Sequence, residues 1–60
     1  MDEKEREKKN RQAWKLYVEG IEKKIPEKLE EAAKIWKEAD YPLTSDVALI
    51  LAKAMRGTNG

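Results

Sequence analysis

The sequence predicts an all-α protein, a three-helix bundle over residues 1–56 that forms a single domain. Large apolar residues recur at the i, i+3, i+4, i+7 spacing of a helical face. The two prolines stand between these segments, where a proline ends one helix and begins the next. With 60 residues and no Gly/Ser-rich or Pro-rich linker, the chain has room for one small domain. We expect residues 57–60 to be a frayed tail.

We expect the first helix over residues 3–24. Residues 2–12 carry nine charges and no large apolar side chain, so the first turns of this helix should be a solvated, charge-rich segment. Gly20 lies inside the helical pattern, at a cost of about 1 kcal/mol relative to Ala. It therefore marks either a close-packing point or an early stop. The apolar face of the helix comprises Trp14, Tyr17, Val18, Ile21 and Ile25.

The second helix should run over residues 26–39. Pro26 disfavours the helical conformation at Ile25 and is itself well suited to the first helical position. The chain then passes through Asp40, Tyr41 and Pro42, where the Tyr-Pro bond is trans by default but has a raised chance of being cis. The apolar stripe of this helix comprises Leu29, Ala32, Ala33, Trp36 and Ala39.

The third helix should run over residues 45–56. Thr44, Ser45 and Asp46 are successive N-cap candidates, and Gly57 suits a left-handed position after the last turn. The faces of the three helices together predict a core. Its expected members are Trp14, Val18, Ile21, Leu29, Ala33, Trp36, Val47, Ile50, Leu51 and Met55.

Composition argues against an enzyme. The chain has no His and no Cys, so the usual zinc, haem and iron–sulfur ligand sets are absent, and we expect neither a cofactor nor a metal. Hydroxyl nucleophiles have no histidine base to activate them. Ser45 beside Asp46 is better explained by helix capping than by catalysis. We therefore expect no catalytic residues and no small-molecule substrate.

Charge argues against nucleic acid and membranes as partners. The 13 Lys and Arg residues are balanced by 12 Asp and Glu residues, which leaves a net charge of +1. Such a chain generates no strong field towards phosphates or anionic lipids. The longest apolar run, residues 47–52, is too short to span a bilayer or to form a signal-peptide core. We expect a soluble protein, cytoplasmic if it is natural.

The third helix is apolar nearly all round, which suggests an interaction surface. Leu49 lies about 200° from Val47 on a helix of about 3.6 residues per turn. A helix apolar on all sides is usually covered on both sides, which three helices do not easily achieve. Either long Lys and Glu stems cover its flanks, or a partner helix or a second copy binds there. The candidate partner surface comprises Leu16, Leu43, Ala48, Leu49 and Ala52.

The sequence also resembles a computationally designed or redesigned small helical protein. The resemblance is one of style and rests on the Glu/Lys surface, the Pro, Thr/Ser/Asp and Gly residues at helix boundaries, and the absence of reactive side chains. It implies a scaffold without catalytic activity. Gly20, the loop at residues 40–44 and the two tryptophans suggest instead a redesigned natural backbone or a natural protein. In the alternative interpretation the chain is a natural helical interaction or self-association module that uses its apolar third helix.

Overall fold

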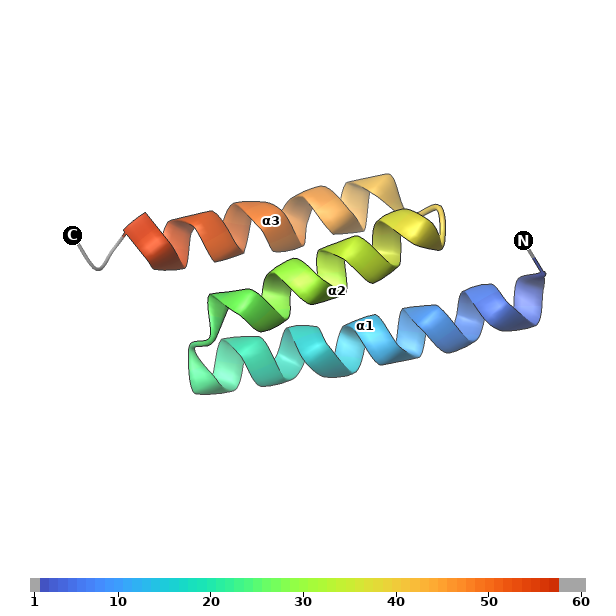
Figure 1. The fold of residues 1–60 in the computed structure, drawn as a ribbon, viewed down its shortest axis with the longest axis horizontal. Coiled ribbons are helices and arrows are strands. Elements are labelled where there is room, and N and C mark those ends of the chain that lie inside the picture. The colour runs from blue at the N-terminus through green and yellow to red at the C-terminus, as the bar shows by residue number, and fades with distance from the viewer. Residues whose placement is uncertain (1, 58–60) are drawn as a thin grey trace.

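The computed structural model describes residues 2–57, which form three helices in the order α1 (Glu3–Lys23), α2 (Pro26–Glu38) and α3 (Pro42–Gly57) (Figure 1). No strand occurs in these residues. The predicted all-α three-helix bundle is confirmed. The tail was predicted over residues 57–60: Gly57 instead belongs to α3, and residues 58–60 lie outside the described residues.

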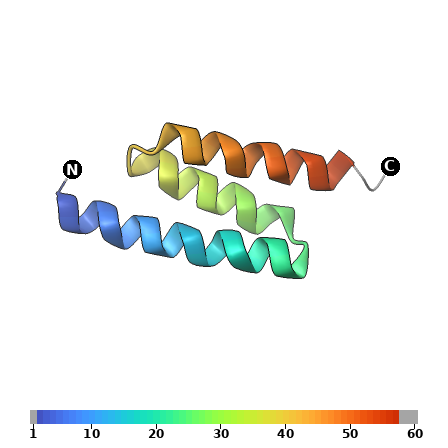
Figure 2. The same cartoon turned by 180° about the vertical axis from the view of Figure 1, so that it is seen from behind.

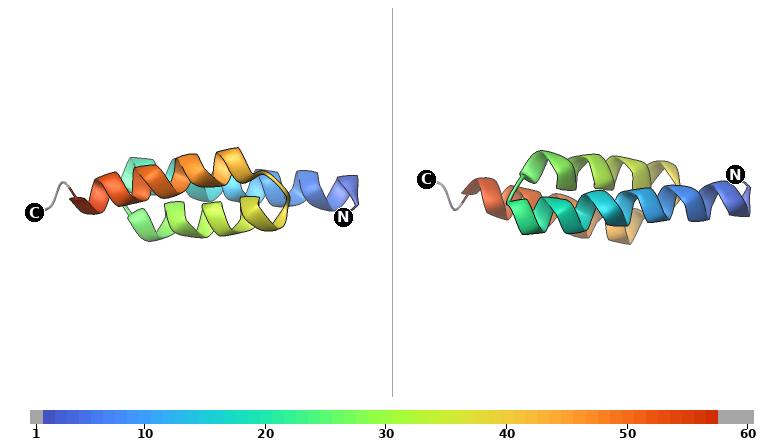
Figure 3. Two further views of the ribbon diagram at one scale, coloured as in Figure 1. Left: turned by 90° about the horizontal axis from the view of Figure 1, so that it is seen from above. Right: turned by 90° about the horizontal axis from the view of Figure 1, so that it is seen from below.

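The three helices form a flat layer with α2 in the middle. α2 packs against both neighbours, whereas α1 and α3 make few contacts with each other (Figures 1 and 2). The molecule measures 42 × 18 × 11 Å along its principal axes. Seen along the layer, α2 lies to one side of α1 and α3, so the cross-section is a wide V (Figure 3). The open side of the V has no helix across it.

Short turns with left-handed residues join the helices. Lys24 (φ 56°) ends α1, and Ile25 donates its amide to the Gly20 carbonyl at 2.8 Å. Ile25 is extended and Pro26 begins α2, as the sequence predicts. Asp40 (φ 68°) forms the second turn, where an aspartate tolerates this conformation better than most residues. The Tyr41–Pro42 bond that follows is trans.

Helix α3 begins three residues earlier than expected. The prediction that Ser45 and its neighbours cap the helix was wrong, because Pro42 begins it and Ser45 lies within it. Ser45 is buried, and its Oγ donates to the Ala33 carbonyl at 2.9 Å, which joins α3 to α2. The prediction of a left-handed Gly57 was also wrong, since Gly57 is the last residue of α3 and has no positive φ.

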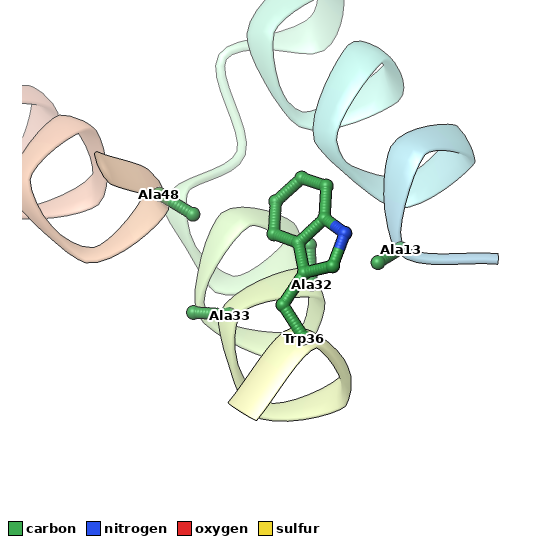
Figure 4. Packing of buried hydrophobic residues seen from close by; sticks show 5 residues of the cluster. All are labelled: Ala13, Ala32, Ala33, Trp36 and Ala48. Carbon is green, nitrogen blue, oxygen red and sulfur yellow. The ribbon is translucent and has the colours of Figure 1, made fainter. Parts of the chain in front are cut away.

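Small residues bring the helices together. Trp36 and Leu29 are the largest fully buried side chains, and the rest of the buried apolar set is alanine (Figure 4). Gly20 is a close-packing point and not an early stop. A Cβ added there would lie 3.1 Å from the Ile25 carbonyl oxygen and 3.2 Å from Leu29 Cγ. The buried alanines are Ala13, Ala32, Ala33, Ala39, Ala48 and Ala52.

Half of the residues predicted to form the core are therefore exposed instead, and the prediction is corrected for them. Leu29, Ala33 and Trp36 are buried as expected, and Leu51 and Met55 are half-buried. Five expected core residues are instead exposed, because α1 and α3 approach α2 through small side chains and no fourth helix covers the large ones. These five are Trp14, Val18, Ile21, Val47 and Ile50.

Candidate functional site

The main surface feature is a group of large apolar side chains on α1 and α3, which we call the open face. Leu43 is 80% exposed and Ile50 66%, while the others are between 41% and 50% exposed. Residues of this kind are normal on a surface when scattered, but a cluster of them marks a binding surface. The open face comprises Trp14, Val18, Ile21, Leu43, Val47 and Ile50.

The position of Trp36 shows which side of the layer the exposed apolar residues of α1 face. The Trp36 ring points into the space between α1 and α3 (Figure 4). Its Nε1 donates to Asn10 Oδ1 at 2.8 Å, and its ring meets Trp14 edge to face at a centroid distance of 5.2 Å. Tyr17 completes the aromatic cluster, 5.3 Å from Trp14. Trp14 therefore lies on the open side of the V, and Val18 and Ile21 follow it at helical spacing.

The contribution of α3 follows from its contacts with α2. Ser45, Ala48 and Ala52 face α2. On one flank of this contact, Arg56 forms a bidentate ion pair with Glu30: its Nη2 and Nε donate to the two carboxylate oxygens at 2.9 Å and 3.1 Å. Glu30 lies about 120° around α2 from Trp36, so this flank is on the closed side of the V.

The opposite flank of α3 consequently lies on the open side. Val47 is about 180° around α3 from Arg56 and lies towards this side. Ile50, in contrast, is between about 140° and 200° around α3 from Ser45, Ala48 and Ala52, so Ile50 and its neighbour Leu43 point away from α2, towards the outer edge of the layer. The α1 stripe therefore faces the open side of the layer, whereas the α3 stripe extends from the open side at Val47 to the outer edge of the layer at Leu43 and Ile50. No charged residue lies within the α3 stripe, because the charges of α3 are Asp46, Lys53 and Arg56.

Polar groups around the open face are solvated. A shallow depression on α1 is lined by Trp14 and Val18 together with Arg11, Lys15, Glu19 and Glu22; its surface is mostly apolar, and it is open to solvent and not an enclosed pocket. Glu19, at its edge, pairs with Lys28 of α2 and with Lys23, whose Nζ lies at 3.6 Å. The hydrogen bond from Lys28 and the two positive charges lower the pKa of Glu19 below its ordinary value of 4.5.

The structure separates the five residues predicted as a partner surface. Leu43 lies on the open face. Leu49 is 46% exposed but lies on the flank of Arg56, seven residues or two turns away, and so faces the closed side. Leu16 is half-buried and packs against the buried cluster.

The prediction for Ala48 and Ala52 is corrected. Ala48 is 0% exposed and Ala52 1%, because they form the contact with α2 and present no surface to a partner. Sequence reasoning missed most of the open face by assigning its residues to the core. The available signal was that α3 carries two apolar stripes, one of small residues and one of large residues. Three helices are too few to cover both.

Comparisons with protein-family models, curated proteins and solved structures find no match. In residues 2–57, no three acidic side chains come close enough together to hold a metal ion. Across the same residues, every helix is too short or too polar to cross a membrane.

Proposed function

We propose that the protein is a non-catalytic helical interaction module that binds a helical partner through the open face. One observation carries the proposal: six large apolar side chains, each at least 41% exposed, form one stripe on α1 and one on α3 in a layer only three helices wide. Their exposed parts amount to about 600 Å² in total, of which about 260 Å² belong to α1 and about 340 Å² to α3. Covering them removes apolar surface from water at about 25 cal/mol per Å².

A helix is the partner that fits this shape. The residues on α3 stand at i, i+4 and i+7, and those on α1 repeat the same spacing. Parallel rows of this kind are grooves for the apolar face of another helix. The partner then occupies the open side of the V and completes the packing that α1 and α3 do not provide for each other.

A designed scaffold is the second candidate function. Complete hydrogen bonding favours it, because every buried side-chain nitrogen and oxygen in the described residues has a hydrogen-bond partner, as a designer would require. A scaffold needs no partner, so changes on the open face should then alter nothing but solubility.

Sedimentation of a triple variant tests the proposal. Leu43→Lys/Val47→Lys/Ile50→Lys removes the apolar stripe and leaves the contact of α3 with α2 intact. We would measure the mass of the protein alone and mixed with a peptide of residues 42–57, with the peptide alone as a control. For the parent chain, we expect the mass to rise with concentration either when the protein is alone or when it is mixed with the peptide. For the triple variant, we expect no rise in either measurement.

Two controls make the result specific. Leu49→Lys places the same charge on the closed side of α3 and should leave association unchanged. Peptide that displaces α3 would bind the triple variant as well, so loss of binding in the variant identifies the open face. A parent chain that stays monomeric and ignores the peptide would contradict the proposal.

A further inference from the structure

We infer that the occupant of the open face is a second copy of this chain, packed with the two α3 helices antiparallel about a twofold axis. The inference rests on the proposed function and names its partner. It is drawn from the pattern of the α3 stripe and from the position of the charges beside the stripe, and the size of the stripe sets the expected affinity.

The α3 stripe is complementary to itself. Leu43, Val47, Ile50 and Ala54 form a continuous row at i, i+4, i+7 and i+11, and all four are exposed. A twofold axis through the middle of the row sets Val47 against the partner's Ile50 and Leu43 against the partner's Ala54. Each large residue at one end thus meets a small one, and no charge is trapped in the contact.

The charges beside the stripe select the antiparallel arrangement. Asp46 and Lys53 are seven residues apart, so they lie on the same flank of the stripe, one on each side of its centre. When two helices pack antiparallel, residues on the same flank face each other. Asp46 then lies next to the partner's Lys53, and the twofold axis repeats the pair. A parallel arrangement would place the two charges on opposite sides of the contact.

The size of the α3 stripe fits a weak dimer. The exposed parts of Leu43, Val47 and Ile50 amount to about 340 Å² on each copy, so two copies would bury about 700 Å², which is less than a standard interface. We therefore expect dissociation constants of about 0.1–1 mM.

A charge-reversal cycle tests the inference on the full chain. Sedimentation should show a monomer–dimer equilibrium. Asp46→Lys and Lys53→Asp, made singly, each bring like charges together twice and should weaken dimerisation about tenfold. The double variant Asp46→Lys/Lys53→Asp recreates both pairs and should restore the parent affinity.

Two results would overturn the inference. One is a monomer at every concentration, and the other is a dimer whose affinity ignores the single reversals. Circular dichroism of each variant shows whether the helices are intact. A chain that stays monomeric yet binds the peptide of residues 42–57 on its open face would refute the second copy as partner while the proposed function stands.

Discussion

At the scale of single residues, small side chains decide how closely the helices approach. Gly20 lets the backbone of α1 lie against the start of α2, and the alanines of α2 and α3 do the same on the other side. Because these positions set the distance between helices, the large side chains beside them cannot also be enclosed. A residue without a large side chain thus controls what its larger neighbours expose.

Replacing Gly20 with alanine should destabilise the protein by about 1 kcal/mol, although alanine is the better helix former. The new Cβ would lie 3.1 Å from both the Ile25 carbonyl oxygen and Lys28 Cβ, and these atoms cannot swing away as a flexible chain end does. Urea denaturation would measure the loss. Gly57→Ala is the matched control, since an added Cβ there has no neighbour within 4 Å. Equal gains at both positions would contradict the close packing of α1 on α2.

The ion pair of Glu19 should be visible in its titration. Because Lys28 donates a hydrogen bond to it, the folded pKa of Glu19 is below the ordinary 4.5. The stability from this pair is complete above pH 4.5 and is lost as the pH falls through the lowered pKa. Lys28→Gln should raise the pKa of Glu19 towards its ordinary value, with Lys23 still lowering it. Carbon-detected NMR titration of the carboxyl group measures this, and an unchanged pKa in the variant would rule out the pair.

At the scale of the elements, the charged start of α1 is docked. Arg6 donates from Nε to the Ala39 carbonyl at 3.1 Å, and its guanidinium lies 4.7 Å from the centre of the Tyr41 ring. This single side chain ties the first turns of α1 to the turn between α2 and α3. The expectation that residues 2–12 are solvated is therefore corrected at Arg6, whose contacts lie more than thirty residues along the chain, and at Asn10, which accepts the hydrogen bond from Trp36.

Arg6→Ala should lower the free energy of unfolding by about 1 kcal/mol, since it removes a hydrogen bond to a buried residue and a cation–π contact. Thermal denaturation followed by circular dichroism measures the change. Lys4→Ala, which removes an exposed charge from the same segment, should cost less than about 0.5 kcal/mol. Equal effects of the two substitutions would show that Arg6 acts only through its charge.

Local signals predict the elements well where a residue acts on its own neighbours. Pro26 and the apolar periodicity place the first two helices within one residue at each end. The start of α3 is missed because both Pro42 and Ser45 suit a helix start, and the choice depends on Ser45 bonding to Ala33 in another helix. The same holds for the candidate surface. Periodicity finds both stripes of α3, but the stripe that faces α2 is selected by how closely the helices pack.

At the scale of the whole molecule, α2 connects parts that hardly touch each other. α1 and α3 make few contacts, so their packing against α2 is what joins them. Within residues 2–57, this layer buries only two large side chains completely, Trp36 and Leu29. The free energy of unfolding of a chain this short should be about 3–9 kcal/mol, and a few side chains supply much of it.

Trp36→Ala should therefore unfold the whole molecule. Trp36 is 0% exposed, contacts Trp14 and Tyr17 of α1, and belongs to the same buried cluster as Ala48 of α3. Truncating a buried tryptophan costs about 3–5 kcal/mol, which is comparable to the entire stability. We expect circular dichroism to show a large loss of helix at room temperature, and hydrogen exchange to show loss of protection in all three helices together.

Trp14→Ala provides the comparison, because it removes a ring of the same type from the open face. Trp14 is 47% exposed, so this variant should lose less stability and remain folded, with Trp36 still bonded to Asn10. Since the open face adds little to the folding of a single chain, its substitutions should change association more than stability. If Trp14→Ala were as damaging as Trp36→Ala, the open face would be part of the core in solution, and the V would be closed.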